Sequence, residues 1–357
     1  MLKKVMVAMS GGVDSSVAAF LLKEVGYSVT GVTMCLGAGS GGESRCCGLD
    51  AVADAKRVCD HLQLPHYAFD FSREMDEKII SRYIAEYSRG RTPNPCIDCN
   101  RHLKFGSLLA KAEALGFDYL ATGHYAAIVR EKGKFFLKRP RDKEKDQTYF
   151  LYVIPCESLG KILFPLAPLT KAMVRELARK SGLPVAEKTE SQDLCFVGKH
   201  AYPDFVARHM GGAEPGPIVD RDGRRLGTHR GIVHYTTGQR SGLGIAHSVP
   251  LYVLAIDAPG NRLIVGEKWA LKAPGLLAGE VHLLANDWPR EVEAKIRYRR
   301  PAACCVAVWE DDKVRVSFPE PEEAITPGQA VVFYNGDYVL GGGVIEEVLH
   351  AVSGKNQ

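Results

Sequence analysis

The 357-residue chain lacks several features that would define its class at once. No apolar run reaches the length needed to cross a bilayer, which argues against a membrane-spanning protein. No internal repeat or low-complexity tract is present, so solenoids and long unstructured linkers are not expected. The opening Met1-Leu-Lys-Lys leads straight into an apolar run. We therefore expect no secretory signal peptide and a cytoplasmic protein.

Ten cysteines are present, but they do not resemble the disulfide framework of a secreted domain. Two pairs are adjacent in sequence, Cys46-Cys47 and Cys304-Cys305, which fits a reducing compartment. The second Cys-x-x-Cys that a structural zinc site usually needs is absent. The apolar content of 46%, the charged content of 25% and the length indicate a globular chain of two or three domains.

The most informative stretch is a glycine-containing segment that starts at Ser10 and reads Ser-Gly-Gly-Val-Asp-Ser. A strand-like run, 5–9, precedes it, and a helical pattern that stops at Gly26 follows it. In this order the backbone N–H groups of the turn and of the helix N-terminus face an anion. The segment has neither a Walker A ending nor the dinucleotide Gly-x-Gly-x-x-Gly pattern. We predict a phosphate-binding loop whose contacts are Ala8, Met9, Ser10, Gly11, Gly12, Val13, Asp14 and Ser15.

Residues 1–120 alternate strand-like and helical patterns, which predicts an α/β domain with a doubly wound parallel sheet. Ligands of such sheets bind at the carboxyl ends of the strands. Met34 and Gly123 each follow a strand-like run and are further candidates for contact with a nucleotide. Core packing is the alternative for the Met34 side chain. Strands are expected at 5–9, 29–34, 66–71 and 118–121, and helices at 17–25, 50–62, 74–87 and 102–115.

Beyond residue 200 the pattern changes to short strand-like runs between glycine- and proline-rich turns. A helix is expected at 170–180, before this region, and one short helix at 202–210 opens it. Closely spaced short strands after Pro274-Gly275 suggest a small β-barrel or sandwich. We therefore expect three domains: a catalytic α/β domain at 1–200, a small central domain at 201–273 and a C-terminal β-barrel at 274–357.

Two cysteines stand in stretches of unusual composition. Cys99 lies in Arg-Thr-Pro-Asn-Pro-Cys-Ile-Asp-Cys-Asn-Arg, near the start of an expected helix and just before further basic residues. Such surroundings depress a thiol pKa, so an exposed Cys99 should be reactive. Cys195 lies about a hundred residues later in Glu-Ser-Gln-Asp-Leu-Cys-Phe. Three interpretations stay open for this pair: ligands of a structural zinc, unrelated buried thiols, or a redox or sulfur-transfer pair.

The motifs together resemble a known family. The first segment resembles the pyrophosphate-binding loop of the ATP pyrophosphatase (PP-loop) superfamily. The ordered set of Ser-Gly-Gly-Val-Asp-Ser, Thr-Pro-Asn-Pro, Ala-Thr-Gly-His-Tyr, Lys-Asp-Gln-Thr-Tyr-Phe-Leu and Ser-Gln-Asp-Leu-Cys-Phe resembles the bacterial tRNA-specific 2-thiouridylases. The similarity continues through Tyr-Thr-Thr-Gly-Gln-Arg, Arg-Tyr-Arg and Thr-Pro-Gly-Gln-Ala, so it covers nearly the whole chain.

The resemblance implies an ATP-dependent tRNA-uridine 2-sulfurtransferase that forms AMP and pyrophosphate. ATP, with Mg²⁺ close to Asp14, would adenylate the C2 oxygen of the wobble uridine, U34, in the tRNAs for Glu, Gln and Lys. Cys195 would carry a persulfide delivered by a relay protein or a cysteine desulfurase. Cys99 would be the nucleophile that forms a disulfide with Cys195. The implied tRNA contacts are Asn94, Pro95, Cys96, His124, Lys145, Asp146, Gln147, Arg297, Tyr298 and Gln329; we expect a monomer.

Cys96 departs from the family pattern, which has Asp at the matching position. Cys96, Cys99 and Cys195 would suit a [4Fe–4S] cluster with one open iron, so a cluster-dependent form of the same thiolation is an alternative. Two other kinds of function also stay open. A PP-loop ligase that adenylates a small carboxylate would need neither Cys99 nor Cys195, and a non-catalytic ATP- and RNA-binding protein would tolerate their replacement by alanine.

A basic stretch supports an RNA partner. Residues 130–145 carry eight Lys and Arg against three Asp and Glu, and three arginines surround Tyr298. Lysine and arginine neutralise phosphates, and an aromatic ring stacks on an unpaired base. The alternative for the stretch is a solvated charged face, and the alternative for His124 is a neutral, hydrogen-bonded core histidine.

Overall fold

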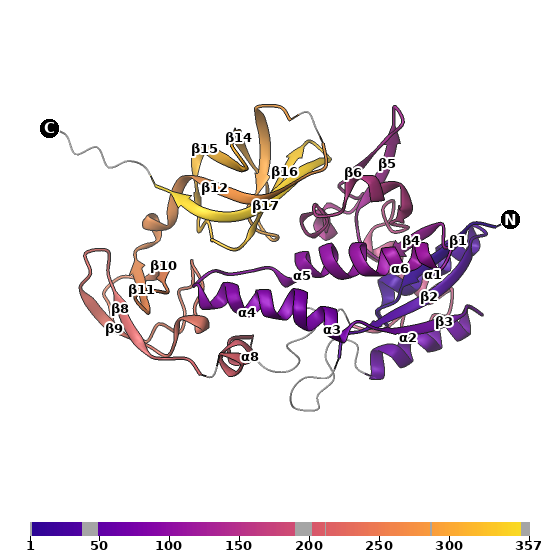
Figure 1. Ribbon diagram of the computed structural model, residues 1–357, viewed down its shortest axis with the longest axis horizontal. Coiled ribbons are helices and arrows are strands. Elements are labelled where there is room, and N and C mark those ends of the chain that lie inside the picture. The colour runs from indigo at the N-terminus through magenta and orange to yellow at the C-terminus, as the bar shows by residue number, and fades with distance from the viewer. Residues whose placement is uncertain (1, 38–48, 190–201, 211, 286–287, 351–357) are drawn as a thin grey trace. The chain divides into compact units, whose positions relative to one another are not determined.

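The computed structural model describes residues 2–37, 49–189, 202–210, 212–285 and 288–350 (Figure 1). The chain forms two compact units. The first contains 1–80, 95–199 and 337–339, and the second contains 81–94, 200–336 and 340–357. Within the described ranges, no helix is both long and apolar enough to span a bilayer.

The first unit is built on a parallel sheet with the strand order β3-β2-β1-β4-β7 (Figure 1). The first strand, β1, is in the middle, and the chain then extends the sheet outward on both sides. This order places the ends of β1, β2 and β4 next to one another. The strands are β1 (Lys4–Ala8), β2 (Ser28–Cys35), β3 (His66–Asp70), β4 (Tyr119–Thr122) and β7 (Ile162–Leu163).

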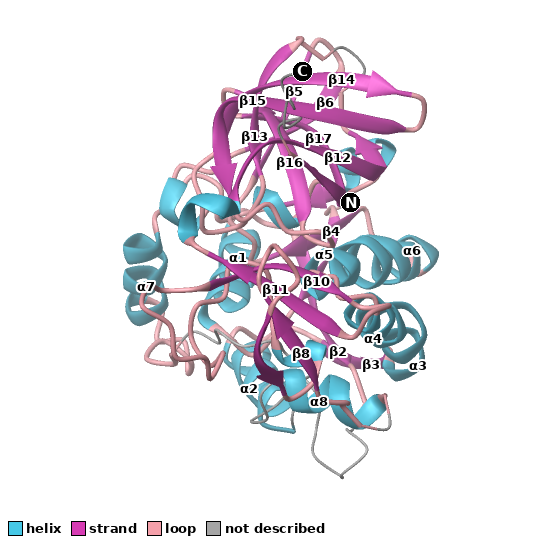
Figure 2. Ribbon diagram, turned by 90° about the vertical axis from the view of Figure 1, so that its left-hand side faces the viewer, coloured by secondary structure: helices cyan, strands magenta, loops and turns pink. Residues whose placement is uncertain are grey.

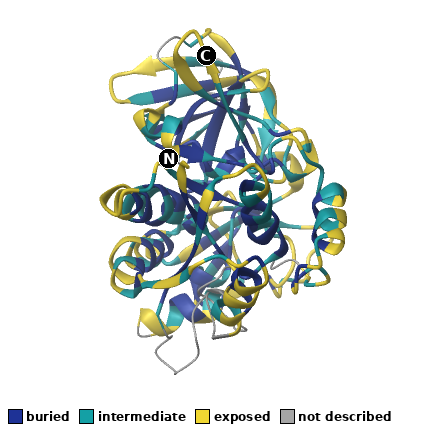
Figure 3. Cartoon of the chain, turned by 90° about the vertical axis from the view of Figure 1, so that its right-hand side faces the viewer, coloured by how far each residue is buried: buried dark blue, intermediate teal, exposed yellow. Residues whose placement is uncertain are grey.

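Helices cover this sheet as the strand–helix alternation predicts. Val5 and Val7 of β1 share one hydrophobic core with residues of α1, α2 and α7, so these helices cover one face. Met6, between them, is fully buried on the other side of the strand. Figure 3 shows such buried segments as dark blue stretches inside the chain. The helices are α1 (Val13–Glu24), α2 (Leu49–His61), α3 (Ser72–Glu74), α5 (Pro95–Asp98), α6 (Leu109–Ala114) and α7 (Lys171–Lys180).

Two helical stretches are wound differently from the expected α-helix. Residues 74–87 are helical as predicted, but Met75–Ile80 is a π-helix that leads into α4 (Ser81–Ser88). Cys99–Leu108 is also a π-helix, ahead of α6. π-helical winding is rare in proteins, and where it occurs it is often at a functional site. Amphipathic spacing alone does not distinguish a π-helix from an α-helix.

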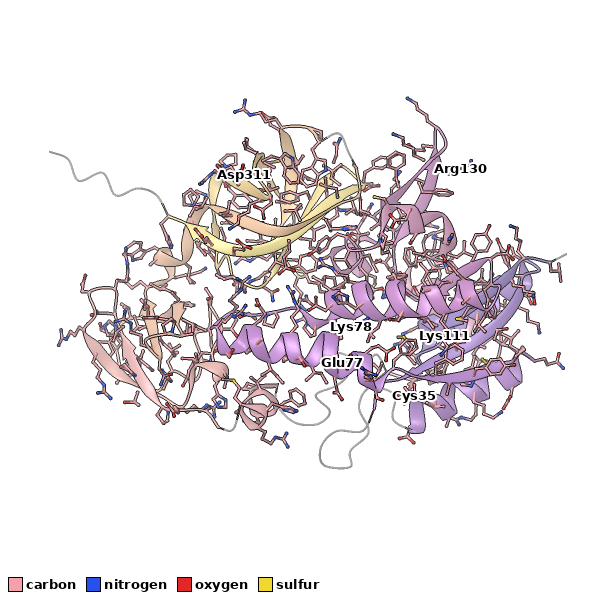
Figure 4. The ribbon with its side chains drawn as sticks, in the orientation of Figure 1. Cys35, Glu77, Lys78, Lys111, Arg130 and Asp311 are labelled. Atoms are coloured by element: carbon pink, nitrogen blue, oxygen red, sulfur yellow. The ribbon has the colours of Figure 1, made fainter. Side chains whose placement is uncertain are left out.

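A β-hairpin within the basic stretch is absent from the sequence prediction. It pairs β5 (Ala127–Glu131) with β6 (Lys134–Lys138), and its two turn residues, Lys132 and Gly133, both have positive φ. A two-residue turn of this type matches the twist of the flanking strands, and glycine adopts it without strain. Figure 4 shows Arg130 on this hairpin, where its guanidinium lies 5.7 Å from the ring centre of Phe135.

The second unit contains two β structures. The smaller is a four-stranded sheet in the order β10-β11-β8-β9, and its core includes Ile218, Val253 and Leu263. It is preceded by α8 (Tyr202–His209). The strands are β8 (Gly216–Val219), β9 (Arg225–His229), β10 (Tyr252–Asp257) and β11 (Arg262–Gly266).

The larger structure is a β-barrel of six strands in the order β12-β15-β14-β13-β16-β17, closed by pairing of β12 with β17 (Figure 2). Alternating inward residues such as Val314, Val316 and Phe318 fill its core. The predicted fold class, a parallel-sheet α/β domain followed by a small central domain and a β-barrel, is confirmed. The strands are β12 (Lys272–Leu283), β13 (Glu291–Lys295), β14 (Ala303–Glu310), β15 (Lys313–Glu323), β16 (Ala330–Asn335) and β17 (Tyr338–Leu349).

Candidate active site

A cavity of about 320 Å³ in the first unit lies at the carboxyl ends of β1, β2 and β4. This is the edge at which parallel sheets bind ligands. The cavity brings together most of the predicted nucleotide contacts and several of the predicted thiol and tRNA contacts. The predicted residues that line it are Ala8, Met9, Ser10, Asp14, Ser15, Met34, Pro95, Cys96, Cys99, Gly123, His124 and Gln147.

The serines of the phosphate-binding loop are held by the loop's own backbone. The Ser10 N–H donates to Ser15 Oγ at 3.2 Å, and Ser15 Oγ donates to the Gly12 carbonyl at 3.3 Å. Ser16 Oγ also donates to the Gly12 carbonyl, at 2.8 Å. Gly12 is the N-cap of α1 and has no side-chain cap. The N-terminal N–H groups of the helix therefore face the loop without a capping side chain in their way.

Two glycines in this region permit close backbone contacts. Gly11 has φ +69°, and a Cβ there would lie 2.5 Å from the Ala51 carbonyl oxygen. A Cβ on Gly123 would lie 2.6 Å from the Ser15 backbone nitrogen. The loop after β4 therefore packs directly against the start of α1. Gly123 lines the cavity as predicted, and the structure adds a steric reason for glycine.

Three of the predicted loop residues lie behind the cavity rather than on its surface. Val13 is buried at 6% exposure and packs in the sheet core, while Gly11 and Gly12 form the turn itself. Met34 is 9% exposed, so most of its side chain belongs to the core and only a part of it lines the cavity. The core-packing alternative for Met34 thus holds for most of its side chain, and its contact with a nucleotide stays a prediction.

Asp14 is held by two partners from distant parts of the chain. The Lys171 ammonium lies 2.7 and 2.8 Å from its two carboxylate oxygens, and the Tyr125 hydroxyl donates to Oδ1 at 2.9 Å. Sequence reasoning missed both partners, because 111 and 157 residues separate them from Asp14. The one signal for Lys171 is its place near the start of the helix expected at 170–180, directly after Thr170, the observed N-cap of α7.

A second lysine, Lys188, supports the loop from behind. Its ammonium donates to the Gly11 carbonyl at 3.0 Å and to a carboxylate oxygen of Asp54. Arg57 pairs with the same carboxylate. The hydrogen bond from Lys188 is the main reason that the pKa of Asp54 lies below its usual value. Asp54 therefore stays ionised and fixes Lys188 beneath the glycine turn.

Cys96 and Cys99 also line the cavity and are both partly buried. Cys96 lies in α5, which begins at Pro95, a favourable first helical residue. Cys99 opens the π-helix, and Asn100 beside it donates from Nδ2 to the Phe150 carbonyl at 2.9 Å. Cys195 lies outside the described residues.

His124 lines the cavity between Thr122 and Lys104, which also line it. Its Nδ1 lies 2.7 Å from Thr122 Oγ1 and its Nε2 lies 3.4 Å from the Lys104 ammonium. An ammonium only donates, so Nε2 accepts and the ring proton resides on Nδ1. Burial first and the Lys104 charge second hold the pKa of His124 well below its usual value. His124 is thus a neutral ring that orients Lys104.

The predicted tRNA-contact segment 145–147 adjoins this cavity through Gln147. Its Oε1 accepts from the Tyr125 N–H at 2.8 Å, and its own N–H donates to the Tyr125 carbonyl at 3.0 Å. Asp146 is buried, and one oxygen accepts from both the N–H and the hydroxyl of Thr148. Within this segment, the Asp146 carboxylate organises the chain, and Lys145 is the more exposed charge.

The remaining predicted tRNA contacts lie in the second unit and make internal hydrogen bonds. Arg297 donates to the Thr237 carbonyl at 3.0 Å and to the Thr326 hydroxyl. Gln329 donates to the Thr92 carbonyl at 2.7 Å. Tyr298 is partly exposed, with the Lys295 ammonium 5.4 Å from its ring centre. Asn94 ends the 81–94 segment of this unit.

The cysteines away from the cavity differ in chemical reactivity. Burial raises the pKa of Cys59 to about 11 and that of Cys305 to about 12. Cys35 ends β2 (Figure 4), while Cys156 and Cys304 are exposed. Within the described residues no three His, Cys, Asp or Glu side chains gather as a metal site. A site with three or more protein ligands would therefore need residues outside those ranges.

These features define a class: a nucleotide-binding domain with a parallel sheet, whose glycine loop and two thiols share one cavity. The family models that match the chain agree with this architecture. They are a tRNA methyl transferase HUP domain over residues 3–199, a tRNA methyl transferase PRC-barrel domain over 203–267 and an aminomethyltransferase beta-barrel domain over 274–345.

The chain is also similar to named proteins over nearly its full length. The tRNA-specific 2-thiouridylase MnmA 1 of Syntrophus aciditrophicus is 56% identical over 349 residues, 98% of this chain and 94% of that protein. MnmA of Moorella thermoacetica is 50% identical over 356 residues, 96% and 99% of the two chains. A solved structure, a predicted tRNA methyltransferase subunit from Methanocaldococcus jannaschii, is 18% identical with TM-score 0.33, covering 59% of this chain and 89% of that one.

The chain belongs to the tRNA-specific 2-thiouridylase family. Its activity is ATP-dependent sulfur transfer that 2-thiolates the wobble uridine, U34, of tRNA.

Proposed function

We propose that the cavity of the first unit carries both halves of the reaction, adenylation of the uridine and delivery of sulfur to it. The observation that supports this is its mixed lining: Asp14 and Ser15 of the phosphate-binding loop share one enclosure with Cys96 and Cys99. A ligase for a small carboxylate would need the loop but not the thiols. The substrates would be the tRNAs for Glu, Gln and Lys, as the family resemblance implies.

In the first step, the C2 oxygen of the uridine attacks the α-phosphorus of ATP, and pyrophosphate leaves. An amide-like oxygen is a poor leaving group, and its AMP ester is a good one. The base must leave the anticodon stack to reach an enclosed site. We propose that Pro95 and Cys96 line the base, and that Lys104, oriented by neutral His124, faces the charge that develops on the α-phosphate.

Magnesium would assist the departing pyrophosphate. The Asp14 carboxylate and the loop hydroxyls are hard oxygen donors of the kind Mg²⁺ prefers, so the part of the cavity lined by the loop suits the ion. Mg²⁺ would neutralise charge on the phosphates, while the loop N–H groups bind their oxygens.

In the second step, a persulfide on Cys195 attacks C2, AMP leaves, and a Cys195–S–S–C2 link forms. The Cys99 thiolate then attacks the Cys195 sulfur, which breaks the S–S bond. The two cysteines are oxidised to a disulfide while the transferred sulfur is reduced and stays on the uridine. A cellular dithiol must reduce the disulfide before the next cycle. A relay protein or a cysteine desulfurase would supply the persulfide sulfur, and a reducing cytoplasm would suit these thiols.

The iron–sulfur version of this chemistry is a second candidate, because Cys96 lies in the same cavity as Cys99. Only these two of its three thiols lie in the described part of the chain, and two thiolates do not complete the ligand set. Anaerobic purification followed by iron and sulfide analysis separates the two versions. A colourless, fully active enzyme would eliminate the cluster.

We also propose three domains with limits near residues 200 and 273. The basic segment 130–145, Arg297, Tyr298 and Gln329 would contact the tRNA outside the cavity. Phosphate contacts made by such cations should weaken steeply as salt is raised.

The test of function is nucleoside mass spectrometry of tRNA from a bacterial strain that lacks its own 2-thiouridylase. Wild type should restore 2-thiouridine, while Cys99→Ser and Cys195→Ser should not. Cys304→Ser is the matched control, because Cys304 is an exposed thiol of the barrel. Restoration by both serine variants would refute thiol-dependent transfer and favour a non-catalytic role for the two cysteines.

A further inference from the structure

Lys171 belongs to α7, which is far from the phosphate-binding loop in the sequence but packs in the same core as α1. Its side chain is only 13% exposed. Both oxygens of Asp14 lie within 2.8 Å of its ammonium. Few lysines are buried to this degree without a specific partner. The contact therefore marks a position at which the fold places a positive charge directly beside the loop.

The negative charge of Asp14 must be neutralised before a polyphosphate can bind beside it. Asp14 is an acidic residue within a loop that we propose binds a polyphosphate, and an unpaired carboxylate there would repel the ligand. Lys171 cancels this charge in the structure. A divalent cation that arrives with the nucleotide would cancel it as well, because carboxylates are preferred ligands of Mg²⁺.

We propose that Lys171 is a pyrophosphate-binding residue of the adenylation site, held by Asp14 until the nucleotide and its magnesium replace it. This inference rests on the proposed use of the loop for ATP. The ammonium is a compact charge on a flexible four-carbon stem, so it can turn from a carboxylate to a neighbouring phosphate oxygen. It would then neutralise the leaving pyrophosphate, whose charge grows as the bond to the α-phosphorus breaks.

The surroundings hold the base of Lys171 in place while leaving this motion available. The Lys171 N–H donates to Asp142 Oδ2 at 2.8 Å, and Thr170 caps α7 by accepting from the Met173 N–H at 3.3 Å. These contacts use the backbone and the cap, not the ammonium. The Tyr125 ring centre lies 5.8 Å from the ammonium, and the Tyr125 hydroxyl would keep Asp14 oriented after Lys171 leaves.

The other cationic side chains near the loop interact with different partners. Lys188 is committed to the Gly11 carbonyl and Asp54, and Arg57 to Asp54. Lys104 lies with His124 in the cavity lining. Of these charges, Lys171 is the one whose described carboxylate partner also lines the cavity, so ligand binding acts directly on its ion pair.

The experiment compares ligands that contain or lack the β- and γ-phosphates. Isothermal titration calorimetry of the full chain would measure ATP, inorganic pyrophosphate and AMP, each with Mg²⁺ and with EDTA. Because hydrogen bonds to charged groups contribute about 1.5–3 kcal/mol, Lys171→Met should weaken ATP and pyrophosphate about 10- to 100-fold in Mg²⁺. AMP should change by less than about twofold, since it lacks the β- and γ-phosphates that Lys171 would bind. Wild type should bind ATP and pyrophosphate more tightly in Mg²⁺ than in EDTA, where Lys171 stays on Asp14.

Two variants act as controls. Lys171→Arg keeps the charge and should recover most of the ATP affinity. Lys180→Met removes a lysine from the same helix whose ion pair with Glu176 is exposed, and it should change no affinity. Equal weakening of ATP and AMP by Lys171→Met, or no weakening of either, would overturn the assignment. Equal affinity of wild type for ATP in Mg²⁺ and in EDTA would overturn the exchange.

These outcomes are separate from those of the thiolation assay. If wild type restores 2-thiouridine but Lys171→Met binds ATP and pyrophosphate normally, this inference fails and the proposed function stands. If wild type restores no 2-thiouridine but Lys171→Met loses affinity as expected, the proposed function fails and Lys171 is still a polyphosphate-binding residue.

Discussion

Two groups of residues that line the cavity are built in different ways: the phosphate-binding loop, called the phosphate end below, and Cys96 with Cys99, called the thiol end. At the phosphate end, one contiguous segment supplies the loop and the serines, and hydrogen bonds of 2.8–3.3 Å within the segment fix their positions. At the thiol end, Cys96 and Cys99 stand on two successive helical segments, the second wound as a π-helix. The phosphate end is therefore defined by local backbone geometry, and the thiol end by how two helical segments follow one another.

Because of this difference, we expect substitutions at the two ends to impair different steps of the reaction. Damage to the phosphate end should reduce nucleotide binding and adenylation together, because one loop serves both. Damage to the thiol end should stop sulfur delivery and leave the nucleotide chemistry in place. The predictions below test this separation.

The largest effect is expected for Cys99→Ser. Loss of the proposed nucleophile should lower 2-thiouridine formation by about a thousandfold or more, because a serine hydroxyl is a far weaker nucleophile toward sulfur. Pyrophosphate release from ATP in the presence of tRNA should stay within about threefold of wild type. The two rates would be followed by nucleoside mass spectrometry and a pyrophosphate assay. Parallel loss of both would mean that the two ends do not act separately.

Asp14→Asn should give the converse result. It removes the carboxylate but keeps the side-chain size, and tRNA-dependent pyrophosphate release should fall by about a hundredfold. Alkylation of Cys99 by iodoacetamide, mapped by peptide mass spectrometry, should proceed at the wild-type rate. A marked change in that rate would show that the phosphate loop also controls the thiol.

Gly123→Ala tests the close contact between the two loops at the phosphate end. Its Cβ would lie 2.6 Å from the Ser15 nitrogen, so the start of α1 must shift. Such overpacking costs about 1–3 kcal/mol, and we expect ATP to bind roughly tenfold more weakly. Gly227→Ala is the control, because its nearest atom would be 3.4 Å away. Equal ATP affinity in both variants would contradict the steric role.

Cys96→Asp tests the departure from the family pattern. With persulfide transfer, the change should alter the thiolation rate by less than about threefold, because Cys99 and Cys195 remain. With a cluster, one thiolate ligand is replaced by a poorer donor, and activity and bound iron should fall together. Rates and iron content measured on one anaerobic preparation distinguish these results.

The smallest effect concerns pH. The pKa of His124 is lower in the folded chain than its ordinary value, so the unfolded chain binds more protons as the pH falls below about 6.5. Its contribution to stability is therefore full above that pH and is lost toward the folded pKa. Urea unfolding at pH 7.5 and 5.5 should show less acid destabilisation in His124→Gln than in wild type. His66, His229 and His234 have lowered pKa values too and would remain in the variant.

The same division explains what could be predicted from the sequence. β1, the loop and α1 are consecutive, so their order alone predicted the phosphate-binding shape that the structure contains. Lys171 and Lys188 could not be predicted, because their partners lie between 134 and 177 residues away and the interactions depend on tertiary packing. The β5–β6 hairpin could not be predicted, because its two-residue turn, Lys132-Gly133, lacks the Asn-Gly or Asp-Gly pair that signals such a turn most strongly. Cys195 remains a prediction, since it lies outside the described residues.

The buried thiols have a consequence for the persulfide transfer that we propose. A persulfide exchanges with any accessible thiolate, so every bystander cysteine is a competing acceptor. With pKa values of about 11 and 12, Cys59 and Cys305 are almost wholly protonated in a neutral cell and shielded by packing. Burial in the core thus also makes sulfur transfer more selective, because it prevents Cys59 and Cys305 from accepting persulfide sulfur.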